Sequence, residues 1–310
     1  LTYSQFWARE QLDDYQNQRL RELIDHSYHN VPFYREIFDD MGLKSYDIQT
    51  KEDLVRLPVI TKDDLKRNKD KHIAQNINQC ARIFASSSGS TGEPFQYFKT
   101  KHSESFLKAT AIRGWNWMGY KLGDPYVKLS MNPRGSLIKK IQDIMNNSLY
   151  MSSKQLINEE FVRIAELINK FNPEYIRGYP VPLYFLAKHY KEKFGKYPGT
   201  SLKALNTTGS TLNDEDREMI EKVFGVKIFD AYSCEGGAVF YECPFHGCYH
   251  PSEEYAIQEY IEDSFTLSSP ERPLRHITTD LHNFASPFIR YDTGDYIVTG
   301  NDERCSCGRN

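Results

Sequence analysis

Residues 85–95 of the chain, "ASSSGSTGEPF", directly follow the apolar stretch "ARIF". Two glycines, Gly89 and Gly92, permit a tight turn in which consecutive backbone N–H groups converge on an anion, and the neighbouring hydroxyl side chains add neutral donors. Composition alone is equally compatible with a flexible Ser/Gly linker. The short length of the stretch, and its expected place between a strand and a helix, favour an anion-binding loop. It is not a Walker A loop, because no Gly-Lys-Ser/Thr sequence closes it.

The segments around this loop alternate between helical and strand-like patterns. Apolar residues recur at intervals of three and four over residues 5–40, and Thr61 with Asp64 forms a capping box for another helix. After the loop in the sequence, patterns typical of amphipathic helices alternate with patterns typical of apolar strands as far as "VKIFDAY". This order predicts a mostly parallel sheet with helices on both faces. From Tyr255 onward, short alternating stretches predict the antiparallel strands of a smaller sheet or barrel.

The predicted fold class is therefore α/β, with layered, mostly parallel sheets flanked by helices and a small antiparallel β appendage. We expect three parts within residues 1–310: a helical segment over 1–80, an α/β nucleotide-binding core over 81–240, and a zinc-stabilised antiparallel subdomain over 241–310.

The charge and hydropathy of the chain exclude several classes of protein. Of 310 residues, 39 are Lys or Arg and 42 are Asp or Glu, and no stretch gathers basic residues as a nucleic-acid surface requires. No window approaches the roughly 18 consecutive apolar residues of a membrane span. Residues 1–13 lack the pattern of a signal peptide. We therefore expect a cytoplasmic protein without nucleic-acid partners or a membrane span, and leave open whether it forms an oligomer.

Three more motifs follow the loop along the chain. "NTTGSTLND" looks like an adenine-flanking Gly-rich turn, "DAYSCEGG" like an aromatic-x-x-Glu motif, and "IRYDTGDYIV" like a ribose-binding Tyr-x-Thr-Gly-Asp motif. Together with "RIFASSSGSTGEPFQYF", and in this order, they resemble the signatures of the adenylate-forming superfamily of acyl-CoA synthetases, adenylation domains and luciferases. Glu93 departs from the pattern, since lysine is commoner there and supplies a counter-charge for phosphate. "HNVPFYREIFDDMGL", "LPVITKDDL", "ECPFHGCYH" and "CSCGR" resemble, more closely, phenylacetate-CoA ligases and capsule-biosynthesis ligase-like proteins.

This resemblance spans nearly the whole chain and implies ATP-dependent activation of a small-molecule carboxylic acid. The acid would attack the α-phosphorus of ATP, giving an acyl-adenylate and pyrophosphate, and the acyl group would then pass to CoA, as in an aryl- or acyl-CoA ligase. Two alternatives stay open: transfer to an amine in polysaccharide or natural-product biosynthesis, and a nucleotide-binding scaffold without turnover. The superfamily's small C-terminal domain, with its catalytic lysine, is expected beyond Asn310, so this acid-thiol ligase would be impaired when limited to residues 1–310.

The resemblance also assigns the ATP-binding residues. The β- and γ-phosphates would be held by the loop residues Ser87, Ser88, Gly89, Ser90, Thr91 and Gly92. Adenine would lie between the turn at Gly209 and Ser210 and the ring of Tyr232, and Asp295 would bind the ribose hydroxyls. Glu235 would help hold Mg²⁺, a hard cation that prefers oxygen ligands. The structural alternatives are that Asp295 is only a turn residue and that Glu235 is only an exposed acid in a loop.

The remaining assignments concern the reacting groups. Arg290 and Glu235 are the candidate catalytic residues, with Arg290 as a donor to the phosphoryl group. The alternative is that Arg290 forms an ordinary ion pair. The acid would lie against Gly178, Tyr179 and Pro180 together with Gly236.

Cysteines gather toward the end of the chain, where two loops carry Cys243, His246, Cys248 and His250, and then Cys305 and Cys307. Thiolate and imidazole groups in two loops predict a structural, tetrahedral zinc site rather than disulfides, with reduced, unliganded cysteines as the alternative. The resemblance to ligase-like proteins implies the set Cys243, His250, Cys305 and Cys307. It stays open whether Cys248 or His246 replaces one of these four.

Overall fold

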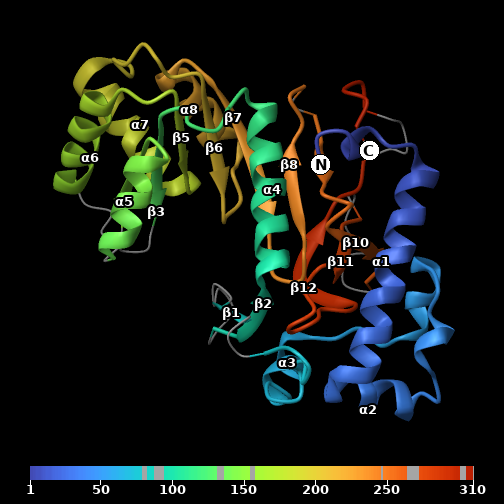
Figure 1. Cartoon of the computed structure of the whole chain (residues 1–310). Helices are drawn as coiled ribbons and strands as arrows, with labels where there is room; N and C mark the ends of the chain where they lie inside the picture. Colours follow the sequence, from blue (N-terminus) through green and yellow to red (C-terminus); the bar gives the residue numbers. More distant parts are fainter. Residues whose placement is uncertain are drawn as a thin grey trace. The chain divides into compact units, whose positions relative to one another are not determined.

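The computed structural model describes residues 1–78, 82–86, 94–130, 136–153, 158–245, 247–263, 272–300 and 305–309. The chain divides into two compact units. Unit 1 comprises Leu1–Ala111, Ser233–Val239 and His250–Asn310, and unit 2 comprises Ile112–Tyr232 and Phe240–Tyr249. Figure 1 shows the course of the chain through both units.

Unit 2 is built on a mostly parallel sheet, as the alternation of strands and helices predicts. The strand order is β4-β3-β5-β6-β7-β8-β9, and the pairs from β4 to β7 are parallel. The parallel strands are β3 (Tyr126–Ser130), β4 (Ser148–Ser152), β5 (Tyr175–Gly178), β6 (Ala204–Thr208) and β7 (Lys227–Ser233). The sheet continues into β8 (Val239–Glu242) and β9 (Tyr249–Pro251). Apolar strand residues such as Val127, Ile176 and Leu205 are fully buried, which accounts for their continuous apolar runs.

Helices of unit 2 connect these parallel strands. They are α5 (Leu137–Met145), α6 (Asn158–Phe171), α7 (Pro180–Phe194) and α8 (Asp214–Phe224). Helices α7 and α8 end at Gly195 and Gly225, each in the left-handed conformation, as the sequence predicts. Apolar residues of α6, α7 and α8, including Ile168, Leu186 and Ile220, join the strand residues in one buried cluster.

Unit 1 contains the N-terminal helices and a small antiparallel sheet. The helices are α1 (Arg9–Asn30), α2 (Pro32–Asp40) and α3 (Lys62–Arg67), with 3₁₀ turns at Ser4–Phe6, Ser45–Asp47 and Lys51–Arg56. The predicted capping box begins α3, because the Thr61 hydroxyl oxygen accepts a hydrogen bond from the N–H of Asp64 and the Asp64 carboxylate accepts one from the N–H of Thr61. The sheet consists of β10 (Ala256–Ile261), β11 (Leu274–Asp280) and β12 (Tyr291–Ile297), paired antiparallel in that order. This confirms the predicted antiparallel appendage.

The N-terminal helices pack against the end of the same small sheet. Leu23, Ile24 and Phe38 belong to one buried cluster with Phe288 and Tyr291. The backbone of residues 284–289 is held by side chains from the helical segment. The Tyr34 hydroxyl donates to the carbonyl of Pro287 at 2.8 Å, and the Nε2 atom of His26 lies 2.9 Å from the carbonyl oxygen of Phe284. The first 80 residues and most of the last 70 therefore share one unit, and the boundaries expected at residues 80 and 240 do not coincide with the division into units.

The hydroxyl-rich loop begins and ends in a two-stranded hairpin. Strands β1 (Arg82–Ser86) and β2 (Gln96–Thr100) pair antiparallel, with Ser86 opposite Gln96. Helix α4 (Lys101–Trp117) follows β2 directly. The expectation that the loop lies between a strand and a helix was therefore wrong, because β2 precedes the helix without a break in the sequence.

No helix in the described ranges is long and apolar enough to cross a lipid bilayer. The cytoplasmic location stays a prediction.

Three histidines of unit 1 make its stability depend on pH. Burial lowers the pKa of His72 to about 4, and burial likewise lowers the pKa of His276 and of His282 to about 4. An unfolded histidine binds its proton below a pH of about 6.5, so the unfolded chain binds more protons than the folded chain between these values. The free energy of unfolding should therefore fall as the pH drops from about 6.5 to 4. Burial raises the pKa of Asp280 to about 6, which offsets part of this fall.

We expect the substitution His72→Gln to flatten this dependence, because glutamine keeps a donor for the Pro287 carbonyl and does not titrate. Urea unfolding at a series of pH values from about 7.5 to 4.5 measures the slope, and His72 should account for roughly 3 kcal/mol across the range. His29→Gln, at an exposed position, is the matched control. An unchanged slope in His72→Gln would contradict the assignment.

Candidate functional site

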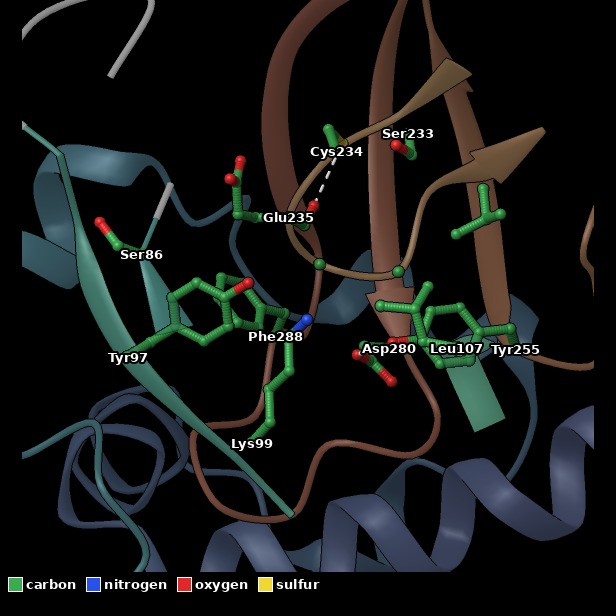
Figure 2. A pocket seen from close by; sticks show the side chains of 13 residues that line it. Ser86, Tyr97, Lys99, Leu107, Ser233, Cys234, Glu235, Tyr255, Asp280 and Phe288 are labelled. Carbon is green, nitrogen blue, oxygen red and sulfur yellow. Dashed lines mark hydrogen bonds between the residues drawn. The ribbon is translucent and has the colours of Figure 1, made fainter. Parts of the chain in front are cut away.

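A cavity of about 250 Å³ lies within unit 1 (Figure 2). Its polar and charged lining comes from β2, from the ends of β1, β7 and β11 and from the turn after β7, and aromatic side chains complete it. The described lining residues are Ser86, Tyr97, Lys99, Leu107, Ser233, Cys234, Glu235, Gly236, Gly237, Val239, Tyr255, Asp280 and Phe288. Glu235 and Gly236, two residues that the sequence predicts at the site, thus line one cavity.

The turn that carries Glu235 packs tightly against the small sheet. The N–H of Cys234 donates to the carbonyl of Ala238 at 3.0 Å, and the Thr278 hydroxyl donates to the carbonyl of Gly236 at 3.1 Å. Gly237 has a φ of +97°, and a Cβ atom there would lie 2.8 Å from the Cβ of Ala256 and 3.2 Å from the Cα of Asp280. Only glycine fits this position, so the close packing of the turn fixes the backbone beside Glu235.

Asp280 contributes a buried carboxylate to the cavity. Its Oδ1 atom accepts hydrogen bonds from the N–H groups of His282 at 2.8 Å and Asn283 at 3.1 Å, and its Oδ2 atom accepts one from the Tyr255 hydroxyl at 3.2 Å. Burial raises the pKa of Asp280 to about 6, while these hydrogen bonds and the charge of Lys99 act in the opposite direction. The sequence analysis missed Asp280. The stretch "LRHITT", in which apolar and polar residues alternate, is directly followed by the polar "DLHN". This change was a signal that a strand ends there and that an aspartate begins a turn.

Aromatic rings form the wall of the cavity on the side of β2. Tyr97 stacks with Phe95 at a centroid distance of 5.8 Å and meets Phe288 edge-on at 5.0 Å. Burial raises the pKa of Tyr97 well above its usual value, and the charges of Glu235 and Asp280 raise it further. The Tyr97 phenol is therefore protonated at neutral pH and offers a hydrogen-bond donor. Tyr97 and Lys99 were also missed from the sequence.

Asp295 lies on β12 of the same unit and its residue is exposed. Its N–H donates to the Thr293 hydroxyl at 3.1 Å, and that hydroxyl donates to the carbonyl of His276 at 3.0 Å. Burial raises the pKa of Tyr291, and Glu235 and Asp295 both add to the effect. Both predicted acids are thus close enough to Tyr291 to act on its ring hydroxyl electrostatically, while the binding roles of Asp295 and Glu235 stay predictions.

Arg290 is occupied by interactions within unit 1. Its Nε and Nη2 atoms contact the Glu259 carboxylate at 3.0 and 2.9 Å, and its Nη1 atom donates to the carbonyl of Leu57. The side chain is 8% exposed. These contacts are those of an ion pair, which was the alternative role for Arg290, and the pair is buried. To act at a phosphoryl group, Arg290 would have to break them.

Other predicted residues lie at the carboxyl ends of parallel strands in unit 2. Gly178 ends β5, Tyr179 is the N-cap of α7, and Pro180 is the first residue of that helix. Gly209 and Ser210 follow β6, and Tyr232 is near the end of β7. Because β5, β6 and β7 are parallel neighbours, these ends share one edge of the sheet, the edge at which open α/β sheets bind ligands.

One contact shows how closely two of these turns approach. Gly209 has a φ of +87°, and a Cβ atom there would lie 2.3 Å from the Cε1 atom of Tyr179. The predicted adenine turn and the predicted acid-binding turn therefore touch within unit 2.

The loop residues predicted to hold phosphate, Ser87 to Gly92, lie outside the described residues. Ser86, which directly precedes them, lines the unit 1 cavity.

Of the predicted metal ligands, His250 and Cys307 lie together in unit 1. The Cys307 Sγ atom is 3.2 Å from the Nε2 atom of His250. Cys305 is in the same turn, where its carbonyl accepts a hydrogen bond from the N–H of Gly308 at 2.9 Å. Cys243 belongs to unit 2, where its N–H donates to the carbonyl of Cys248 at 2.8 Å. His246 lies outside the described residues.

We expect Gly237→Ala to destabilise the protein by about 2–4 kcal/mol, because a positive φ costs alanine about 1 kcal/mol and the contact with the Asp280 backbone adds an overpacking cost. Gly42→Ala is the matched control, since Gly42 has a φ of +65° and a Cβ atom there would meet nothing within 4 Å. Urea unfolding of both variants measures the difference. Equal losses of stability would contradict the tight packing of the turn.

The chain is similar to curated CoA ligases over most of its length. It is 28% identical to the phenylacetate-coenzyme A ligase of Thermus thermophilus, over 97% of this chain and 68% of that protein. It is 25% identical to Protein CapK of Staphylococcus aureus, over 94% of this chain and 64% of that protein. The chain spans about two-thirds of the length of these relatives. No protein-family model matches it.

Solved structures show the same fold. A crystal structure of 2-hydroxyisobutyryl-CoA ligase aligns with a TM-score of 0.79 at 17% identity, covering 98% of this chain and 66% of that one. Its match confirms the predicted α/β architecture with a mostly parallel sheet and a small antiparallel sheet. The chain is thus a homologue of phenylacetate-CoA ligases and of Protein CapK with the fold of a CoA ligase, in line with the adenylate-forming superfamily that its motifs resemble.

Proposed function

We propose that the chain is the large, nucleotide-binding part of an ATP-dependent ligase that converts a carboxylic acid into an acyl-adenylate and then into a CoA thioester. The observation that carries this proposal is the lining of the unit 1 cavity. Glu235 and Ser86 share this cavity, and the hydroxyl- and glycine-rich loop follows Ser86 directly along the chain. An acid that can bind a metal therefore lines the same cavity as the residue that directly precedes a loop suited to phosphate.

In the first step, a carboxylate oxygen of the acid attacks the α-phosphorus of ATP, and pyrophosphate leaves. This reaction needs no nucleophile from the protein, so the chain acts by positioning the reactants and neutralising their charge. The loop residues would hold the β- and γ-phosphates, and Asp295 would accept hydrogen bonds from the ribose hydroxyls. At the strand ends of unit 2, the Gly209–Ser210 turn and Tyr232 would hold the adenine, and residues 178–180 would contact the acid.

The donor atoms of the cavity suit Mg²⁺. Glu235 and Asp280 both line it, and carboxylate oxygens are ligands that this hard cation prefers. Of the two, Glu235 would hold the ion, because both oxygens of Asp280 already accept hydrogen bonds. When held by Glu235, the ion would supply positive charge to offset the negative charge that develops during the displacement.

In the second step, the thiol sulfur of CoA attacks the acyl carbonyl carbon, and AMP leaves. Support comes from the curated relatives, which are named phenylacetate-coenzyme A ligases. It also comes from the structural neighbour 2-hydroxyisobutyryl-CoA ligase, which was solved in complex with 2-HIB-AMP and CoA and aligns with a TM-score of 0.77.

Nucleotide binding tests the proposal most directly. We expect ATP with Mg²⁺ to raise the melting temperature of the chain, since a ligand that binds only the folded state stabilises it. Glu235→Gln should weaken this Mg²⁺-dependent binding about tenfold or more, because it removes a charged metal ligand. Glu262→Gln, at an exposed acid just after β10, is the control.

Acid-dependent exchange of pyrophosphate into ATP separates the enzyme from a nucleotide-binding scaffold. Exchange that depends on a particular acid supports adenylation. Nucleotide binding without exchange for any acid in the full-length protein would favour the scaffold. Absence of both would contradict the proposed function.

We also propose that a zinc ion stabilises the end of unit 1. Two ligands of a tetrahedral zinc ion lie roughly 3.5 Å apart given usual Zn–N and Zn–S distances, and the 3.2 Å between His250 and Cys307 is close to this value. Cys305 from the same turn would be a third ligand. Cys243, the fourth ligand implied by the resemblance, stays a prediction from the sequence.

The metal content of the purified protein tests this site. We expect about one zinc per chain in the wild type and a large loss of it in Cys307→Ser, because thiolate ligands contribute much of the affinity of structural zinc sites. Cys234→Ser, at a cysteine that lines the cavity, is the control and should keep its zinc. Atomic absorption gives the ratio, and an unchanged zinc content in Cys307→Ser would remove Cys307 from the ligand set.

A further inference from the structure

Lys99 is the one cationic residue among the described residues that line the unit 1 cavity. It follows Tyr97 by two positions on β2, so the two side chains point to the same face of the strand. Figure 2 shows its side chain extending into the cavity between Tyr97 and Asp280. The ammonium lies 5.8 Å from the centre of the Tyr97 ring, and its charge lowers the pKa of Asp280. Lys99 therefore faces the cavity and not the solvent.

The donors of this ammonium are largely unused within the described part of the chain. The Lys99 side chain is 16% exposed, and its Nζ atom lies 3.6 Å from the Glu104 carboxylate, which is beyond hydrogen-bond distance. The ammonium makes no hydrogen bond to the described residues. An ammonium has three donors, and a charge removed from water is costly unless it is paired and hydrogen-bonded. The cavity thus presents a cation with capacity for an anionic ligand.

An ordinary ion pair with Glu104 is the competing explanation for Lys99. Glu104 lies on α4 and has a second partner, Lys108, whose Nζ atom is 3.4 Å from its other carboxylate oxygen. Lys108 is 70% exposed and lies one helical turn from Glu104, at the spacing of a surface pair. Glu104 therefore has an ion-pair partner without Lys99. A surface ion pair also gives no reason for Lys99 to line a cavity.

The sequence of the loop after Ser86 supplies no cation of its own. Residues 85–95 contain Glu93 and neither lysine nor arginine. A loop of amides and hydroxyls supplies neutral donors only, while the reactants of an adenylation step carry several negative charges. Lys99 is the first cationic residue after the loop in the sequence.

We propose that Lys99 binds an anionic oxygen of the reactants in the unit 1 cavity, either of the acid's carboxylate or of an ATP phosphate. This inference rests on the proposed function and adds a residue to it. The Asp280 carboxylate, held by three hydrogen bonds, is a fixed negative charge near the ammonium. This charge attracts the Lys99 ammonium into the cavity without occupying its hydrogen-bond donors.

Three variants of the chain test the inference: Lys99→Met, Lys99→Arg and the matched control Lys108→Met. Both methionine variants remove a lysine near Glu104, and only one of them removes a cation from the cavity. Melting temperatures of all three establish that they fold. Calorimetry then measures the binding of ATP with Mg²⁺ and of inorganic pyrophosphate, and pyrophosphate exchange gives the concentration of phenylacetate, or of another acid that supports exchange, at half-maximal rate.

A lost charge-assisted hydrogen bond should weaken binding roughly 10- to 100-fold in Lys99→Met, and Lys99→Arg should recover most of it. Weaker binding of ATP or pyrophosphate identifies a phosphate oxygen as the ligand. Unchanged nucleotide binding with a 10- to 100-fold higher half-maximal acid concentration identifies the carboxylate. Both results support the inference.

If Lys99→Met matches Lys108→Met in every measurement while the wild type binds nucleotide, the inference is overturned and the proposed function stands. If the wild type binds neither ATP nor pyrophosphate and exchanges with no acid, both are overturned.

Discussion

The buried carboxylate of Asp280 is the interaction on which the described part of the cavity depends. It ends β11, closes the following turn through the N–H groups of His282 and Asn283, and accepts a hydrogen bond from Tyr255. Gly237 packs against its backbone, so the turn that carries Glu235 is positioned by the same residue. A strand end, a sharp turn and the acid that is proposed to bind the metal are thus coupled through one residue. Because an unsatisfied buried carboxylate is costly, these elements order together.

The charges of the cavity are unbalanced in a way that fits the proposed chemistry. Two carboxylates, Glu235 and Asp280, line it together with a single lysine among the described residues. Burial raises the pKa of Asp280, which is the expected response of an acid in surroundings of low polarity. Anionic reactants would bind poorly in such a cavity without a further cation. Nucleotide and Mg²⁺ are therefore expected to bind as a complex, in the cavity that Lys99 lines together with Glu235, the acid proposed to bind the metal.

The sequence predicted the fold well because its periodicities are strong. Helix ends at Gly195 and Gly225 and the capping box at Thr61 depend on local chemistry that a single sequence reveals. The place of the loop was wrong, because β2 is only five residues long and runs directly into α4, leaving no turn residues to mark the change. The expected domain boundary at residue 80 differed for another reason, since the packing of N-terminal helices on a C-terminal sheet is a long-range contact without a local signal.

The candidate site was predicted in part. Glu235 and Gly236 belong to a recognisable motif, whereas Lys99 and Tyr97 are ordinary strand residues in the sequence. Alternation places these two on one face of β2, but only the pairing and packing of the strand determine that this face lines a cavity. Arg290 was recognised as a candidate from its motif, although its buried contact with Glu259 depends on the register of a different pair of elements.

The pairing of β1 with β2 has an entropic consequence for the segment of chain between them. Ser86 and Gln96 are paired across the hairpin, so both ends of the intervening segment are anchored by backbone hydrogen bonding. The entropy of bringing these ends together is lost when the protein folds, and not when a ligand arrives. A ligand that binds beside Ser86 or Gln96 therefore meets two residues that are already fixed by pairing, and less of its contact energy is spent on ordering them.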